Sequence, residues 1–162
     1  MRIAKTVTGR ILFFVVLVFA ICAFWQTTSM IADNQVQRPE RIKGTGTVTV
    51  NLSNCSIYEY CPSTHYSWGE STHAGRYTNE ASGSFRIIDF SAFSDGVFTA
   101  ANGDQIYWEE NGTAEVILTG GTGRFEGVSG GFAFTEIEIL ETSGYPILTV
   151  RFTFRGEGTI TY

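Results

Sequence analysis

The chain has few lysines and an excess of acidic residues, which argues against two classes of partner. From Asp33 onward the acidic residues number twice the basic ones, and Lys43 is the only lysine. A partner with many phosphates would meet net repulsion from such a surface. We therefore expect no nucleic acid partner, and no contact with an anionic membrane surface by this part of the chain.

Helical periodicity is also lacking after the first 32 residues. No stretch there sustains a period of 3.6 residues, whereas parallel sheets need crossover connections that are usually helices. The absence predicts an all-β domain whose sheet is mostly antiparallel.

Residues suited to metal binding are scarce as well. Cys55 and Cys61 form a close pair, and the only histidines are His65 and His73. A structural zinc site needs four ligands, and only His65 lies near the cysteines. In an oxidising compartment a disulfide between Cys55 and Cys61 is the simpler interpretation, worth roughly 2 kcal/mol by loop-closure entropy. We expect no metal and no cofactor.

The N-terminal segment has the pattern of an export signal. Basic residues precede a charge-free apolar run from Ile11 to Trp25. As a helix this run spans about 22 Å, short of the roughly 30 Å hydrocarbon core. Two outcomes stay open: cleavage of a signal peptide over residues 1–32, or a retained N-terminal hydrophobic helix that anchors the chain through residues 11–31. Both place the rest outside the cytoplasm, in the periplasm or the extracellular space.

The remainder divides into a polar linker, residues 33–43, and a β domain, residues 44–162. About eight short strands are predicted, and Asn102-Gly103 and Asn111-Gly112 are signals for two-residue hairpin turns. Without covering helices, such strands form either a sandwich or a closed barrel. The strand candidates are residues 46–53, 72–78, 82–90, 96–101, 104–110, 113–119, 131–140, 145–154 and 157–162.

Alternation within the last long strands favours the barrel. Glu136 and Glu138 alternate with Ile137 and Ile139. An antiparallel neighbour over 145–154 would bring these glutamates near Arg151 and Arg155 on the outer face. Phe132 and Phe134, however, share the parity of the glutamates. Either a bulge or a covered patch is required between them, and the pattern does not distinguish the two.

The segment Leu118–Phe134, LTGGTGRFEGVSGGFAF, holds six glycines. A phosphate-binding loop or a dinucleotide fingerprint would continue into a helix, but a strand follows here. We interpret the glycines as backbone that turns tightly, with Phe125 as an apolar plug.

This segment resembles the GGTG/GGSG-x-F signature of plant allene oxide cyclases and dirigent proteins, and more closely bacterial exported barrels of the allene-oxide-cyclase-like group. The stretches Ser71–Thr78, Phe98–Trp108 and Phe152–Ile160 are similar to further parts of that group. The resemblance implies an eight-stranded antiparallel closed barrel of calycin type, often oligomeric in plants, so a homo-oligomer is an expectation. The plant enzymes act without a cofactor. None of their catalytic groups matches a residue here.

Three functions are compatible with such a barrel. The first is binding of a small hydrophobic, lipid-like ligand, with Tyr77, Trp108 and Phe152 as walls and His73 or Glu110 as the polar contact. The second is a structural or interaction barrel with a solid core. The third is a cofactor-free isomerase or cyclase, which needs a pKa-shifted group beside an apolar wall. An interior void above roughly 300 Å³ would favour the first and third.

Overall fold

The computed structural model describes residues 36–162. The predicted export segment, its cleavage site and the hydrophobic anchor helix lie outside these residues. Among the residues described, no helix has the length and apolarity needed to span a membrane.

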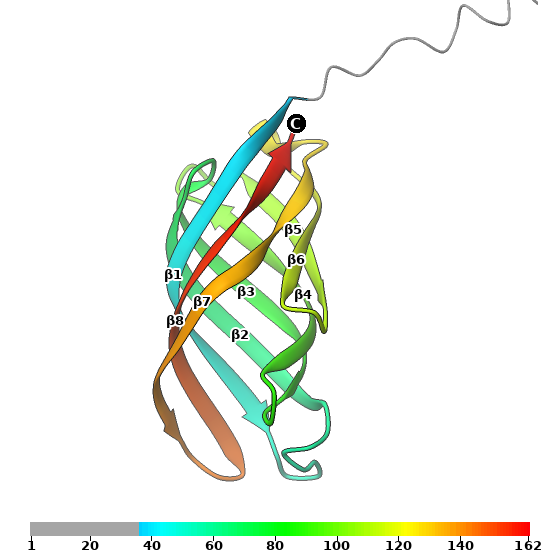
Figure 1. The fold of residues 1–162 in the computed structure, drawn as a ribbon, viewed down its shortest axis with the longest axis vertical. Helices are drawn as coiled ribbons and strands as arrows, with labels where there is room; N and C mark the ends of the chain where they lie inside the picture. Colours follow the sequence, from blue (N-terminus) through cyan, green and yellow to red (C-terminus); the bar gives the residue numbers. More distant parts are fainter. Residues whose placement is uncertain (1–35) are drawn as a thin grey trace, which may run out of the picture. The chain divides into compact units, whose positions relative to one another are not determined.

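Eight antiparallel strands form a closed barrel in which each strand pairs with its neighbours in sequence and the last strand returns to the first (Figure 1). The predicted fold class is therefore confirmed for the barrel. The 3-10 turn η1 (Gly123–Phe125) lies between the sixth and seventh strands. The strands are β1 (Gln37–Asn51), β2 (Cys61–Ser71), β3 (Gly75–Arg86), β4 (Ser91–Ala100), β5 (Gln105–Asn111), β6 (Glu115–Gly121), β7 (Ser129–Ser143) and β8 (Ile147–Thr161).

Several predicted boundaries were wrong. Residues 37–43 are strand rather than linker, because β1 begins at Gln37 and pairs with β8 from there. The segments 72–78 and 82–90 were predicted as two strands, but β3 runs through Gly75–Arg86. Both Asn-Gly turns exist, yet each loop is longer than two residues, and only the glycine of each pair has a positive φ.

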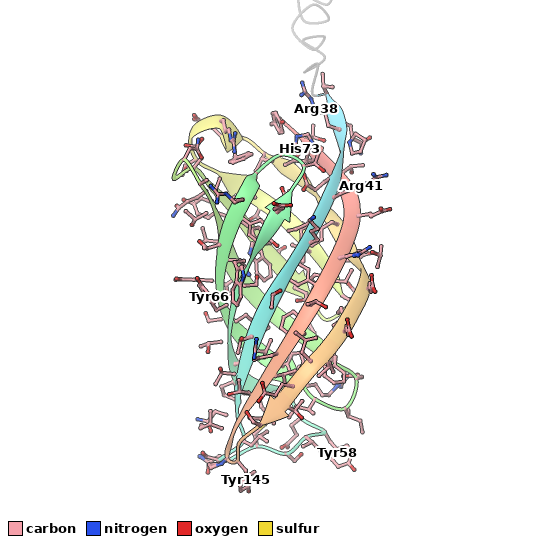
Figure 2. The ribbon with its side chains drawn as sticks, turned by 90° about the vertical axis from the view of Figure 1, so that its left-hand side faces the viewer. Arg38, Arg41, Tyr58, Tyr66, His73 and Tyr145 are labelled. Carbon is pink, nitrogen blue, oxygen red and sulfur yellow. A yellow bond between two sulfur atoms is a disulfide. The ribbon has the colours of Figure 1, made fainter. Side chains whose placement is uncertain are left out.

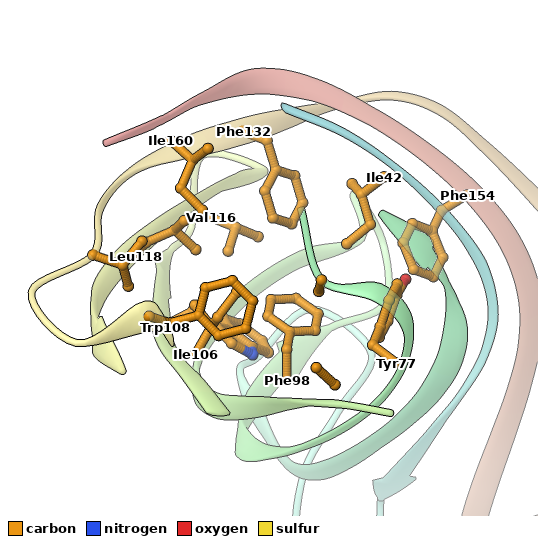
Figure 3. Close-up of a cluster of buried hydrophobic side chains, with 14 residues drawn as sticks. Ile42, Tyr77, Phe98, Ile106, Trp108, Val116, Leu118, Phe132, Phe154 and Ile160 are labelled. Atoms are coloured by element: carbon orange, nitrogen blue, oxygen red, sulfur yellow. The ribbon is translucent and has the colours of Figure 1, made fainter. Parts of the chain in front are cut away.

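Apolar side chains fill the barrel in two clusters. The larger one holds Trp108, Phe98, Phe132 and Tyr77, which point into the interior from different strands (Figure 3). The smaller one includes Val50, Cys61 and Phe85. Their inward positions alternate with outward ones along each strand, as a barrel requires.

A bulge in β7 resolves the conflict of parity. The register between β7 and β8 shifts between Phe134 and Glu136, so Thr135 is the additional residue. Upstream of it Phe132 is buried, and downstream Ile137 takes the inward parity while Glu136 faces out. The bulge, rather than a covered patch, is thus the correct alternative.

The predicted ion pairs across β7 and β8 are confirmed in part. Glu136 contacts Arg155 at 3.3 Å. Arg151 contacts Glu141, also at 3.3 Å, instead of Glu138, because a second register shift follows Ile139. Glu138 lies opposite Thr153.

The glycine cluster closes on a carboxylate of the chain itself. Gly123 has a φ of 59°, and a Cβ there would collide with the carboxylate of Asp104. The backbone N–H of Arg124 donates to Asp104 at 3.3 Å. Phe125 is only 1 % exposed, so the predicted plug is confirmed. Gly123 thus permits this close approach of backbone and side chain.

The disulfide between Cys55 and Cys61 is present. It closes the loop between β1 and β2, and Cys61 lies fully buried in the smaller core cluster.

The wall of the barrel is incomplete beside β7. Strand β6 pairs with β7 only through Glu115–Leu118 and Gly130–Ala133. Among residues 36–162, β8 is the one strand that pairs with β7 beyond Phe134. Figure 1 shows β7 diverging from β6 toward the lower end of the barrel. Residues 135–143 of β7 therefore have a free edge, which we call the open edge of β7.

Candidate functional site

An apolar cavity of about 100 Å³ lies where the two core clusters meet and reaches the open edge of β7. Val48 and Phe85 line it from the smaller cluster, and Phe98 and Trp108 from the larger one. Ile137 and Ile139 form its wall on β7 and are partly exposed, so the cavity opens to the side of the barrel.

A hydrogen-bonded chain of buried side chains fixes one wall. The indole Nε1–H of Trp108 donates to Oδ1 of Asn79 at 2.8 Å. The Asn79 amide nitrogen donates in turn to the Ser67 hydroxyl at 3.2 Å. A buried indole N–H normally finds such an acceptor. These hydrogen bonds hold the ring of Trp108 over β4, where Gly96 leaves room for it.

Glu110 is the ionisable group of this cavity that has no polar partner. It follows Trp108 by two residues on β5 and faces inward, and no hydrogen bond or ion pair to it occurs among residues 36–162. Burial raises the pKa of Glu110 to about 7, because the charged form loses hydration. Its neighbour across the β4–β5 ladder, Ser94, has a buried hydroxyl that is likewise unpaired.

His65 lies on the opposite side of the same cavity. Its Nε2 is 3.0 Å from the hydroxyl of Ser63, and its ring packs edge-on against Phe85. Burial lowers the pKa of His65 to about 4, so the imidazole is neutral at pH 7. The site therefore combines a neutral base, a carboxyl that titrates near neutrality and apolar walls.

The structure brings three of the five predicted ligand-binding residues together. Trp108, Glu110 and Phe152 all line the cavity. Tyr77 lies in the larger core cluster but not on the cavity, and its hydroxyl donates to the carbonyl of Lys43 at 3.3 Å.

His73 lies apart from the cavity, at the end of the barrel where β1 begins and opposite the end that carries Tyr58 and Tyr145 (Figure 2). Both of its ring nitrogens are occupied. Nε2 donates to the carbonyl of Pro39 at 3.0 Å, so Nδ1 accepts from the hydroxyl of Tyr162 at 2.9 Å. This arrangement matches the structural histidine that is common near a barrel end.

Sequence reasoning missed Asn79 and considered His65 only as a metal ligand. Asn79 was missed because the predicted strand ended at residue 78. The alternation of Tyr77, Asn79 and Ala81 on β3 was a signal that could have placed Asn79 inside.

The cavity lining holds a single carboxyl group, that of Glu110. Glu110 has no second carboxylate beside it in the cavity lining, and Glu109 faces outward. Among residues 36–162 no three His, Cys, Asp or Glu side chains cluster in a way that could hold a metal ion. Comparison of the chain with protein-family models and with the sequences of curated proteins yields no match.

Proposed function

We propose that the barrel binds the apolar end of a small molecule that carries a hydrogen-bond acceptor. The observation that carries this proposal is the unpartnered carboxyl of Glu110 in a mostly apolar, laterally open cavity. Partial desolvation of a carboxyl group that has no hydrogen-bond partner costs free energy, part of which a ligand acceptor would offset. In its protonated form Glu110 donates to a carbonyl or ether oxygen.

The cavity volume limits the ligand. A site that encloses a whole drug-sized molecule has at least about 300 Å³, and an apolar cavity of about 150 Å³ accommodates one benzene ring. A volume of about 100 Å³ holds a short or branched alkyl group. A longer ligand would extend through the side opening, over Ile137 and Ile139, rather than lie inside the barrel.

Titration with isopropyl methyl ketone tests this function. The probe presents a branched alkyl group beside a carbonyl, and binding is followed by the NMR resonance of the Trp108 indole N–H, assigned with the Trp108→Phe variant. Since the donor is the protonated carboxyl, saturable binding is expected at pH 5 and should weaken as the pH rises through about 7. An unchanged Trp108 resonance at all concentrations would refute the proposal.

Two matched variants of the same strand sharpen the test. Glu110→Gln retains an N–H donor, so ketone binding should persist at pH 8, where the native chain has lost it. Glu109→Gln removes an outward carboxylate and should behave like the native chain. If isobutylamine binds better at high pH, the carboxylate form of Glu110 recognises cations, and the predicted acceptor class is wrong.

The second candidate is an interaction barrel whose interior is mostly solid. The cavity of about 100 Å³ is smaller than the roughly 300 Å³ void that would favour ligand binding or catalysis, and this small volume favours the second candidate. Export, homo-oligomerisation and membership of the allene-oxide-cyclase-like group stay predictions, and the disulfide is compatible with an oxidising compartment.

A further inference from the structure

We propose that the open edge of β7 binds an extended polypeptide segment in which apolar and basic side chains alternate, as an added strand. Within the part of the chain that the structure describes, residues 135–143 pair with β8 on one side and with no strand on the other. Their remaining backbone N–H and C=O groups point toward the gap beside β6. Another extended backbone satisfies such a row of groups, and main-chain pairing of this kind is an established mode of peptide recognition.

The side chains of the open edge define what the added strand must carry. Between the two register shifts lies the regular segment Glu136–Ile139, in which glutamate alternates with isoleucine. Because opposed residues of neighbouring strands share a face, an apolar residue of the partner would lie beside Ile137 or Ile139 at the mouth of the cavity. The residue that follows it in the partner strand would lie beside Glu136 or Glu138 on the outer face.

Uncompensated negative charge selects basic residues for that outer face. Glu136 and Glu141 each have an arginine on β8. Glu138, and Glu115 at the end of the β6–β7 ladder, form no ion pair with any of residues 36–162. A cationic side chain opposite Glu138 would be attracted, and an anionic one repelled.

The same charges argue against a second copy of the chain as the occupant. Two copies paired through this edge in antiparallel fashion would place their rows of glutamates next to each other. The chain has a net charge of −5, so the general field also opposes self-association.

Bulges and charges also protect edge strands from unwanted pairing. A fully protected edge, however, would not leave three neighbouring aliphatic side chains in water. Ile137 is 48 % exposed, Ile139 41 % and Leu140 50 %. Their exposure marks this edge as a surface that a partner covers.

The test uses the full chain and a hexapeptide of alternating lysine and valine. We expect saturable binding, measured by calorimetry, with NMR shifts in the amides of residues 136–139. The corresponding peptide of alternating glutamate and valine should not bind. Equal affinity for both peptides would overturn the proposal.

Two N-methylated peptides test the backbone pairing itself. In a strand the amides of the lysines point to one edge and those of the valines to the other. Methylation of one set should abolish binding, and methylation of the other should leave it intact. If both methylated peptides still bind, charge attraction acts without strand addition. If neither binds, the peptide does not pair through a single edge. Either result contradicts the proposal.

The variant Glu138→Lys should weaken binding of the lysine peptide by about two- to fivefold, as expected for the loss of one partly exposed ion pair. Glu126→Lys, an exposed position in the loop after η1, changes the net charge equally and should not affect affinity. Thermal unfolding checks that both variants fold. A concentration-dependent dimer that excludes the peptide would assign the edge to a second copy and refute the proposal. Ketone binding at Glu110 is a separate measurement, so the two proposals fail independently.

Discussion

The indole N–H of Trp108 on β5 donates to the side-chain oxygen of Asn79 on β3, over Gly96 of the intervening strand β4. Because both groups are buried, neither finds water if the other is removed. Asn79→Ala should therefore lower the free energy of unfolding by about 1–3 kcal/mol, plus a contribution from the space it leaves. Urea denaturation measures the loss. A change below 0.5 kcal/mol would show that Trp108 finds another acceptor.

Glu110 should make the stability of the barrel depend on pH. Its pKa is about 7 in the folded chain against an ordinary value of 4.5. A raised carboxyl pKa contributes stability that is complete below pH 4.5 and is lost as the pH rises to about 7. Glu110→Gln should thus be more stable than the native chain at pH 8, by up to about 3 kcal/mol, and similar to it at pH 4. Glu109→Gln is the control, and equal behaviour of the two variants would contradict this assignment.

His65 should have the opposite effect in acid. Burial lowers its pKa to about 4 from an ordinary value of 6.5. The unfolded chain therefore takes up a proton at higher pH than the folded one, and His65 reduces stability as the pH falls from 6.5 to 4. His65→Asn should flatten this part of the curve of unfolding free energy against pH. An NMR titration of the His65 ring with a midpoint near 6.5 would disprove the expectation.

Gly96 should be sensitive to a single added methyl group. A Cβ at this position would lie 2.6 Å from Cζ2 of Trp108 and 2.6 Å from Cβ of Ala81. Gly96→Ala should destabilise the barrel by about 1–3 kcal/mol through overpacking. In a Trp108→Phe background, which lacks the larger ring, the same change should cost less. A double-mutant cycle measures this coupling, and strictly additive effects would show that Gly96 does not make room for Trp108.

Gly123 and Gly127 offer a matched comparison of strain with crowding. Both have positive φ, 59° and 76°, but a Cβ at Gly127 would meet nothing within 4 Å. Gly127→Ala should lower the free energy of unfolding by about 1 kcal/mol, through backbone strain alone. Gly123→Ala should cost more, because the carboxylate of Asp104 occupies the space. Thermal unfolding of the two variants compares them, and Asp104→Ala should narrow the difference.

Much of the fold could be predicted because the apolar residues of several strands alternate clearly. In β7 the changed parity between Phe134 and Ile137 predicted an irregularity, and only the structure identified it as a bulge. By contrast, β2 could not be read from the pattern. Its inward positions carry Ser63, His65 and Ser67, so the apolar period that marks a strand is absent.

The candidate site was predicted in part for a related reason. Trp108 and Glu110 follow the period of β5, and local alternation was enough to place them inside. His73 was grouped with them from its residue type alone, whereas its distance from the cavity is a property of the barrel topology. That β6 would end its pairing with β7 early depends on strand lengths, which residue patterns define poorly.

The unequal lengths of the strand ladders imply an order of opening. Strands β1 and β8 pair from Gln37 to Asn51. Strands β6 and β7 are joined by one short ladder only. This ladder includes Gly130 and Gly131, which have no side chains to pack. Local unfolding begins where the fewest bonds must break together. Amide hydrogens of Val116 and Leu118 should thus exchange with solvent before those of β1, and water should reach the interior along this ladder while the rest of the sheet is still intact.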